Sequence, residues 1–212
     1  MNEPRVQQPA GRRPLPNGHL AAAQLRDSFE FLRGFVRNPA QVGSVVPSSR
    51  WLEQRLVRQA GIARARTVVE LGPGTGGTTA ALLQALPATA RLLAVELDPR
   101  FHRHLRASLA DPRLLLQQGS AERIADFLAA HQLPAPDAIV SGIPFSTMPP
   151  ELSQRIAAAV ALVLRPGGHF VAYQVRAHVA AFVGPHLGEP HRQWEMANVP
   201  PVRVFTWVKH TH

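Results

Sequence analysis

The chain has 212 residues, no cysteine and a formal net charge of +9. This length predicts one α/β domain with a sizeable core and an N-terminal extension, and the missing cysteine excludes disulfide bonds and thiolate metal sites. No apolar run approaches the ~20 residues of a membrane span and no secretory signal opens the chain, so we expect a cytoplasmic protein. The ten histidines show no ligand spacing, and no metal is expected.

The positive charge is concentrated at the front of the chain. Residues 1–66 hold eleven arginines and four acidic residues, whereas residues 67–212 hold twelve basic and ten acidic residues. Such asymmetry is typical of proteins with an anionic partner, either nucleic acid or a lipid surface. The alternative is that arginine usage reflects only solubility and genome composition.

The first 66 residues are predicted to contain a disordered tail and two helices. Proline and polar residues dominate residues 1–18, which we expect to be disordered. The pattern of residues 20–37 predicts an amphipathic helix that Asn38-Pro39 ends. This helix is typical of a membrane interface, although it would also suit packing onto the domain. Its apolar stripe and the arginines at the edge are Leu25, Phe29, Leu32, Phe35, Val36, Arg26, Arg33 and Arg37.

A second helix is predicted from Arg50 to Gln59, after the loop Gly43–Ser49. Ser48 or Ser49 is placed to cap this helix. A capped helix N-terminus also binds anions, so Ser48 is a candidate to receive a ligand carboxylate. A plain structural cap is the alternative.

A strand, a glycine turn and a helix follow in residues 67–86. The apolar run Thr67–Leu71 ends at Gly72, Gly74 and Gly76, and an amphipathic run follows at once. Glycine is needed where the backbone takes positive φ or lies against a ligand, and the next helix directs unpaired N–H groups at the turn. The stretch predicts a nucleotide-like ligand.

Two acidic residues narrow the identity of that ligand. The next buried strand, 91–95, ends in Glu96, which follows Gly76 by twenty residues and is placed to accept hydrogen bonds from two ribose hydroxyls. Glu70 precedes the turn, where a carboxylate would repel a pyrophosphate but suits a ligand that bears an ammonium group.

The rest of the chain alternates strands and helices, which predicts a mostly parallel sheet covered on both faces. The expected strands are 114–118, 136–140, 169–175, 192–197 and 202–209, and the expected helices are 121–131, 150–164 and a short one from Ala177. The last two strands should pair as an antiparallel hairpin. Because ligands bind at the carboxyl ends of such strands, Gly72, Glu96, Ser120 and Ser141 should surround one crevice.

The segment from Glu70 to Gly76 resembles motif I of the class I S-adenosylmethionine-dependent methyltransferases, E/D-x-G-x-G-x-G. The resemblance implies a Rossmann-like seven-stranded sheet, mostly parallel with an antiparallel C-terminal strand, and an N-terminal helical extension. It implies S-adenosylmethionine as cofactor, with its methionine end near the turn and its ribose on Glu96. The expected cofactor-binding residues are Glu70, Gly72, Gly74, Gly76, Glu96, Ser120, Ala121, Ser141 and Ser48.

Further stretches resemble bacterial phospholipid N-methyltransferases that modify phosphatidylethanolamine. They are the front segment Phe31–Ser49 with its R-N-P and P-S-S motifs, Val140–Pro144, and the late segment Asn198–Val204. The resemblance implies stepwise N-methylation of phosphatidylethanolamine towards phosphatidylcholine by a peripheral enzyme on the inner face of the cell membrane. It also implies three parts: a tail (1–18), a membrane-binding helix with a cofactor-closing loop and capping helix (19–66), and the methyltransferase domain (67–212).

The main alternative is N6-dimethylation of RNA adenine. Ribosomal RNA adenine dimethylases carry N-[IL]-P-[YF] after strand four, where this chain has Gly142-Ile143-Pro144-Phe145. The glycine removes the amide that polarises the adenine amine, and no C-terminal helical domain for RNA is expected. A third hypothesis is a methyltransferase for a free small molecule. It does not explain the predicted helix whose apolar stripe is flanked by arginines.

No general base is marked in the sequence. Tyr173 and Phe145 are candidates for a cation–π cage around the methylated amine, although packing in the core is the simpler explanation for both. Arg176 and Arg203 are candidates to hold the lipid phosphate, and the alternative is that both are ordinary solvated surface residues.

Overall fold

A computed structural model describes residues 48–210 of the chain. The predicted tail, the predicted helix at residues 20–37 and most of the loop before Ser48 lie outside this range. The described part contains α2 (Arg50–Gln59), α3 (Gly77–Ala85), α4 (Pro99–Ser108), α5 (Ile124–Ala130), α6 (Pro150–Val163), α7 (His178–Leu187) and the 3₁₀ turns Ile62–Arg64 and Ala121–Arg123.

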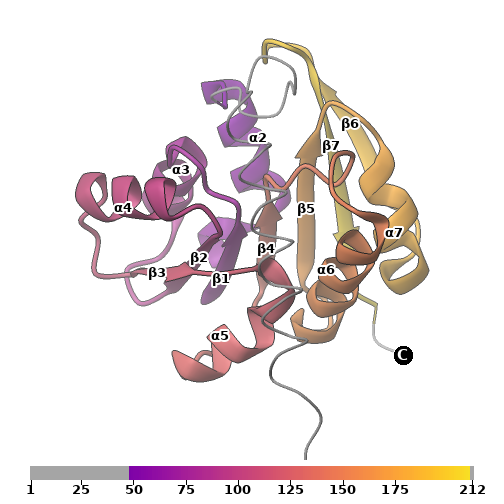
Figure 1. Ribbon diagram of the computed structural model, residues 1–212. Helices are drawn as coiled ribbons and strands as arrows, with labels where there is room; N and C mark the ends of the chain where they lie inside the picture. The colour runs from indigo at the N-terminus through magenta and orange to yellow at the C-terminus, as the bar shows by residue number, and fades with distance from the viewer. Residues whose placement is uncertain (1–47, 211–212) are drawn as a thin grey trace, which may run out of the picture.

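The strands form one seven-stranded sheet in the order β3-β2-β1-β4-β5-β7-β6 (Figure 1). They are β1 (Thr67–Leu71), β2 (Arg91–Glu96), β3 (Leu114–Gln118), β4 (Ala138–Ser141), β5 (His169–Gln174), β6 (His191–Glu195) and β7 (Val202–Val208). The pairs among β1 to β5 are parallel, whereas β7 runs antiparallel to both β5 and β6. The predicted fold class and the closing hairpin are confirmed, with β7 inserted between β5 and the edge strand β6.

Helices cover both faces of the sheet, and each face has its own apolar core. On one face α2 and α3 pack against alternate residues of the central strands, such as Val68 and Val140. On the other face α5, α6 and α7 pack against the residues between them, such as Val69 and Ile139. Burial on both faces explains why β1 is buried along its whole length and reads as a continuous apolar run interrupted by one acid.

The predicted strand 192–197 is observed as β6, His191–Glu195, and two other predicted boundaries shift for local reasons. Strand β4 begins at Ala138 rather than at Pro136, because proline has no N–H to donate to the ladder. The helix predicted at residues 121–131 begins as a 3₁₀ turn, Ala121–Arg123, and becomes α-helical at Ile124. Neither shift moves a residue of the predicted site away from the carboxyl edge of the sheet.

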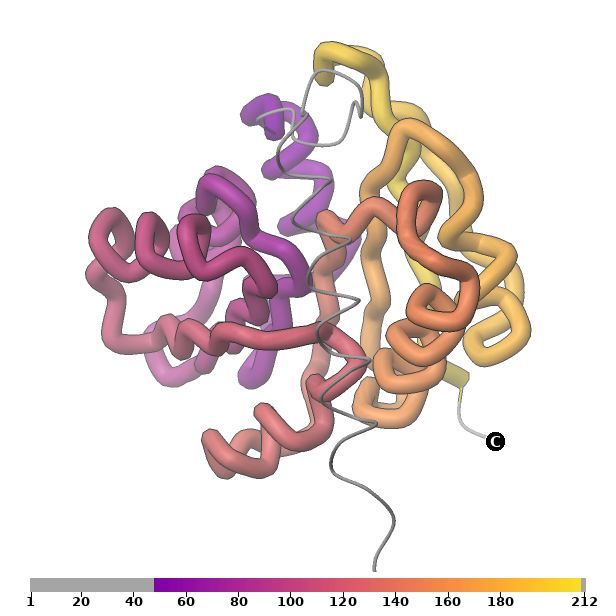
Figure 2. The backbone as a smooth tube through the Cα atoms, in the orientation of Figure 1, coloured from indigo at the N-terminus to yellow at the C-terminus, as the bar shows by residue number. Residues whose placement is uncertain are grey.

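The N-terminal end of α2 and the connection between β6 and β7 lie together at one end of the molecule (Figure 2). The register explains this, because Arg203 near the start of β7 pairs with Gln174 at the end of β5. The β6–β7 connection therefore lies at the carboxyl edge of the parallel strands, the edge where the glycine turn also lies.

Candidate functional site

The glycine turn has the backbone conformation that the sequence requires. Gly72, Gly74 and Gly76 have φ values of 72°, 57° and 90°, in the left-handed region that other residues rarely adopt. Gly76 is the N-cap of α3 and offers no side-chain acceptor to the N–H groups of the first turn. These N–H groups make the helix N-terminus a site for a ligand oxygen.

Glu96 lies at the end of β2 and is tied directly to the turn. Its Oε2 accepts a hydrogen bond from the N–H of Gly74 at 3.0 Å, and its Oε1 accepts one from the N–H of Asp98 at 2.9 Å. Burial raises the pKa of Glu96, which these two hydrogen bonds partly offset. Each carboxylate oxygen keeps further acceptor capacity, so Glu96 can still receive two hydroxyl donors.

Glu70 is a buried carboxyl group with one oxygen that makes no hydrogen bond. It is 1% exposed, and within residues 48–210 its Oε2 has no hydrogen-bond partner. Burial raises its pKa from 4.5 to about 8, and the charge of Glu96 adds to this rise. An isolated buried charge is costly, and a cationic ligand group beside Glu70 would remove that cost.

The candidates at the ends of β3 and β4 are also buried at this edge. Ser120 donates from its hydroxyl to Glu122 Oε1 at 3.2 Å, and Ala121 begins the 3₁₀ turn beside it. Ser141 accepts a hydrogen bond from the N–H of Ile143 at 3.3 Å. Leu71 is the register partner of Ser141 and also of Val95, which precedes Glu96, so the structure brings the predicted strand ends together.

The two serines before α2 have different roles. Ser49 caps the helix by accepting a hydrogen bond from the N–H of Leu52 at 3.2 Å. The Ser48 hydroxyl instead lies 3.1 Å from the Thr78 hydroxyl, in the first turn of α3. Ser48 therefore reaches the glycine-turn helix but is not the cap.

The two aromatic candidates differ in their surroundings. Phe145 is 1% exposed and stacks on Phe182 with ring centroids 6.3 Å apart, so its ring belongs to the core and is not open to a ligand. Tyr173 is half-buried, and its hydroxyl lies 3.5 Å from that of Thr78. A β-carbon on residue 142 would lie only 2.6 Å from the same hydroxyl. Glycine, which has no β-carbon, avoids this clash.

Comparison with known proteins agrees with this geometry. Residues 68–168 match the family described as "Methyltransferase domain". The chain is 33% identical over 147 residues to the ornithine lipid N-methyltransferase of Singulisphaera acidiphila, an alignment that covers 69% of this chain and 77% of that protein. The chain belongs to the class I S-adenosylmethionine-dependent methyltransferases.

Two further comparisons agree with the methyltransferase family but do not identify the methyl acceptor. The ribosomal RNA small subunit methyltransferase A of Nocardia farcinica is 34% identical over 145 residues, which cover 65% of this chain but only 46% of that protein. The O-methyltransferase of Bacillus cereus, solved with S-adenosylhomocysteine, has a TM-score of 0.62 at 13% identity and covers 85% of this chain and 91% of that one. The second likeness shows the fold alone.

The residues of this methyltransferase fit its cofactor, S-adenosylmethionine. The orphaned buried oxygen of Glu70 would receive the cofactor's ammonium group, and Glu96 would receive the ribose hydroxyls. A β-carbon at position 74 would meet nothing within 4 Å, so the turn borders open space there. Among residues 48–210, no group of three histidine or acidic residues is arranged to hold a metal ion, and no helix is long and apolar enough to cross a membrane.

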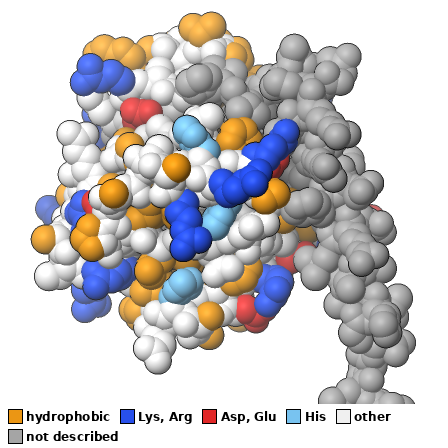
Figure 3. All heavy atoms as spheres, turned by 60° about the vertical axis from the view of Figure 1, so that its left-hand side comes forward, with side chains coloured by type: hydrophobic (Ala, Val, Ile, Leu, Met, Phe, Trp, Pro, Cys, Tyr) orange, Lys and Arg blue, Asp and Glu red, His pale blue; other side chains and the backbone are white. Residues whose placement is uncertain are grey.

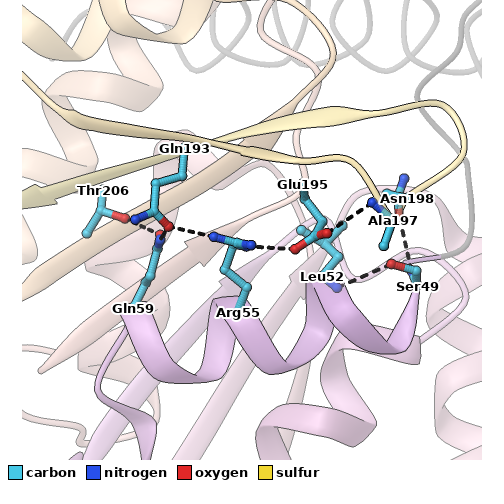
Figure 4. A network of polar contacts seen from close by, with 9 residues as sticks. All are labelled: Ser49, Leu52, Arg55, Gln59, Gln193, Glu195, Ala197, Asn198 and Thr206. Carbon is cyan, nitrogen blue, oxygen red and sulfur yellow. Dashed lines mark hydrogen bonds and ion pairs between the residues drawn. The ribbon is translucent and has the colours of Figure 1, made fainter.

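Sequence reasoning missed the residues that hold the loop before α2. Asn198 accepts a hydrogen bond from the N–H of Ser49 at 2.9 Å and donates to the carbonyl oxygen of Pro200 at 2.9 Å. Next to it Arg55 of α2 forms an ion pair with buried Glu195 at 2.7 Å (Figure 4). The network continues through three more side chains, Gln59, Gln193 and Thr206.

The methyltransferase thus joins its β6–β7 hairpin to the loop that precedes α2. The only sequence signal was the resemblance of the segment beginning at Asn198 to a lipid-modifying family, which assigned no role to the asparagine. A contact across 149 residues cannot be read from local pattern. The contact positions Ser48 beside Thr78 in the first turn of α3.

Proposed function

We propose that this methyltransferase transfers methyl groups to the amine of phosphatidylethanolamine at a membrane surface, towards phosphatidylcholine. A relative named for lipid N-methylation, which aligns over most of its own length, supports a lipid acceptor. The concentration of basic residues in the first 66 residues of the chain supports an anionic surface as partner.

The observation that carries the proposal is the packing of Tyr173 against Gly142. This contact leaves no room for a side chain at the position where base-modifying relatives carry asparagine. The acceptor side of the site therefore presents a phenol hydroxyl beside bare backbone. A flexible primary amine needs only hydrogen-bond acceptors and a clear path, whereas a flat base needs an amide and a stacking ring.

Tyr173 can orient the acceptor amine without removing its proton. Burial raises the pKa of Tyr173 above its usual value of 10, so the phenol stays neutral at physiological pH. A neutral phenol oxygen accepts a hydrogen bond from an amine N–H but is a poor base. We therefore assign Tyr173 to positioning and assign no residue as general base.

Gln174 is a second acceptor at the same strand end. Its Nε2 donates to the carbonyl oxygen of Ile143 at 2.6 Å, which fixes the carboxamide against the β4–α6 loop. Its Oε1 is buried and has no partner among the described residues. S-adenosylmethionine supplies a reactive methyl group on its sulfonium, and the protein has to align the amine with it and exclude water.

Two arginines are proposed to hold the lipid phosphate. Arg176 lies two residues after the end of β5 and is exposed, and Arg203 near the start of β7 pairs in register with Gln174. Both lie at the carboxyl edge of the sheet, the edge to which the end of β5 with Tyr173 also belongs. Guanidinium groups suit phosphate because they donate two parallel hydrogen bonds.

The membrane-binding helix predicted at residues 20–37 lies outside the described residues and is part of the proposal. Phe29→Asp combined with Leu32→Asp should abolish co-sedimentation of the enzyme with liposomes while cofactor binding persists. Undiminished co-sedimentation would favour the packed-helix alternative.

RNA adenine dimethylation is the second candidate, because a ribosomal RNA methyltransferase aligns with this chain. This chain spans about half the length of that relative, and Gly142 stands where the amide would be needed. A labelling experiment separates the candidates. The enzyme is incubated with S-adenosylmethionine labelled in its methyl group and with vesicles of phosphatidylethanolamine, vesicles of ornithine lipid, ribosomal RNA or free ethanolamine.

We expect label in phosphatidylethanolamine, and Tyr173→Phe should lower kcat while cofactor affinity is retained. Label confined to ornithine lipid would show that the acceptor is a different amine-bearing lipid and that phosphatidylethanolamine is wrong. Label confined to RNA or to free ethanolamine would overturn the proposal. Exposed Val208→Ala, at the opposite edge of the sheet, is the matched control and should retain wild-type kcat.

A further inference from the structure

Large exposed apolar side chains gather at the carboxyl edge of the sheet. The described residues contain seven of them, and five belong to segments that end or begin at this edge. These five are Trp51 (65% exposed), Val175 (40%), Trp194 (50%), Met196 (69%) and Val199 (82%). Leu162 and Val208, the other two, lie at the far ends of α6 and β7.

The tip of the β6–β7 hairpin is both apolar and firmly held. Met196 and Val199 project from it, while Asn198 between them is buried and bonded to the N–H of Ser49. That bond brings the first turn of α2, with Trp51, next to the tip. The exposed side chains therefore stand on a hairpin end that is hydrogen-bonded to the residues before α2, and a group of exposed apolar side chains often marks an interaction site.

Trp194 lies on the opposite face of the hairpin from α2. Its strand neighbours Gln193 and Glu195 bond to Arg55, so Trp194, which alternates with them, points the other way. The guanidinium of Arg203 lies 4.4 Å from the centre of the Trp194 ring. An indole with a cation beside it has the composition of a side chain that sits at a lipid–water interface.

The charges around the tip are mostly basic, although Glu53 in the first turn of α2 is a partly exposed acid. Glu195 is the only acid between residues 191 and 210, and it is buried and paired with Arg55. Arg50 and Arg176, which flank this end, are exposed. Arginine and histidine side chains also outnumber acids on the face that carries α4 (Figure 3). Charge alone therefore does not single out the docking surface, but the exposed apolar side chains do.

We propose that Trp51, Trp194, Met196 and Val199 form a membrane-docking tip that inserts into the surface of an anionic lipid bilayer. The inference rests on the proposed lipid acceptor. Tryptophan with aliphatic side chains and flanking arginine is the composition of an interfacial anchor. Exposed tryptophans beside arginines suit both RNA and a lipid interface, but the protruding Met196 and Val199 suit only the lipid surface. Docking by this tip would bring the carboxyl edge, with Tyr173 and the proposed phosphate-binding arginines, to the lipid headgroups.

The first test uses the native tryptophans as depth probes. The chain contains three, and Trp207 is 1% exposed in the core. The full-length enzyme is titrated with vesicles of phosphatidylethanolamine and phosphatidylglycerol whose acyl chains carry bromine, a contact quencher. We expect quenching in the wild type, less in Trp51→Phe and in Trp194→Phe, and almost none in the double variant, in which only Trp207 remains. Equal quenching of the double variant and the wild type would overturn the proposal.

The second test measures binding with a matched control. Met196→Asp combined with Val199→Asp should weaken vesicle binding about tenfold or more, because two inserted apolar side chains become charged. Leu162→Asp changes an equally exposed apolar residue (75%) away from the tip and should bind like the wild type. Binding of S-adenosylhomocysteine shows that each variant is folded.

The outcomes separate this proposal from the proposed function. If the tip variant binds vesicles as the wild type does, or if the wild type binds ribosomal RNA and no vesicles, the docking tip is wrong. Methylation of detergent-dispersed phosphatidylethanolamine is measured in parallel, and the tip variant should retain wild-type kcat there. Tip-dependent binding without any lipid methylation would support docking and overturn the proposed acceptor.

Discussion

The Tyr173 hydroxyl oxygen lies 2.6 Å from the position that a β-carbon on residue 142 would occupy. The carbonyl oxygen of Gly72 lies 3.0 Å from the same position, on the side of the glycine turn. Residue 142 is therefore confined between Tyr173 and the glycine turn. The contact places three strand ends, those of β1, β4 and β5, in direct register around the site.

Gly142→Ala should destabilise the fold by about 1–3 kcal/mol, because the added methyl group overpacks this contact. Urea unfolding measures the change. Adding Tyr173→Phe should recover part of the loss, since the phenol oxygen makes the closest approach. Gly184→Ala is the control: nothing lies within 4 Å of its added β-carbon, and it should be neutral or stabilising by up to ~1 kcal/mol. A Gly142→Ala enzyme as stable as the wild type would contradict the packing.

Glu96→Gln should weaken binding of S-adenosylmethionine by about 10- to 100-fold. The neutral amide keeps the size of the side chain but offers a single acceptor oxygen, whereas the carboxylate bonds Gly74 and Asp98 and would also receive the ribose. Isothermal titration calorimetry measures the Kd. Asp126→Asn, which changes an exposed acid on α5, should leave the Kd within about twofold. Unchanged affinity in Glu96→Gln would remove Glu96 from the cofactor site.

Glu70 should make stability and cofactor binding depend on pH. Its folded-state pKa is about 8 and its ordinary value is 4.5, so between these values the folded protein binds more protons than the unfolded chain. The free energy of unfolding should therefore fall as pH rises from 4.5 to 8, with a slope of up to ~1.4 kcal/mol per pH unit from this group. Glu70→Gln should flatten the slope in urea unfolding across that window.

The same carboxyl group predicts proton release when the cofactor binds. Near pH 7 Glu70 is largely protonated in the free protein, and an adjacent ammonium group would favour its ionised form. Calorimetry in buffers of different ionisation enthalpy should show release of up to one proton in the wild type and less in Glu70→Gln. Equal release in both proteins would place the ammonium group elsewhere.

Asn198→Ala should weaken cofactor binding several-fold, because the partly buried N–H of Ser49 loses its acceptor and Ser48 is held less firmly beside Thr78. Cofactor titration measures the effect. Thr206→Val removes a hydroxyl group from the same hairpin–α2 network but far from Ser49. That control should lower stability and leave cofactor affinity unchanged. Equal affinity in Asn198→Ala and wild type would make Asn198 merely structural.

The local pattern of the sequence predicted most strands and the cofactor side of the site. Positive φ at the glycine turn and a buried acid at the tip of β2 follow from glycine chemistry and strand periodicity, which act over a few residues. The fourth strand was predicted to begin at Pro136 but begins two residues later, at Ala138, because proline has no N–H to donate to the neighbouring strand. The choice between Ser48 and Ser49 as cap needed the actual path of the chain.

The sequence by itself determined the fold class and the cofactor and predicted the edge of the sheet for the ligand, because these depend on short-range periodicity and on one compact motif. The tertiary structure decided what surrounds that edge. It moved Phe145 into the core, set Tyr173 against Gly142, joined Asn198 to Ser49 and gathered exposed Trp51 and Val199 at one tip. These relationships join residues far apart in the chain, so only the packed register of strands and helices creates them.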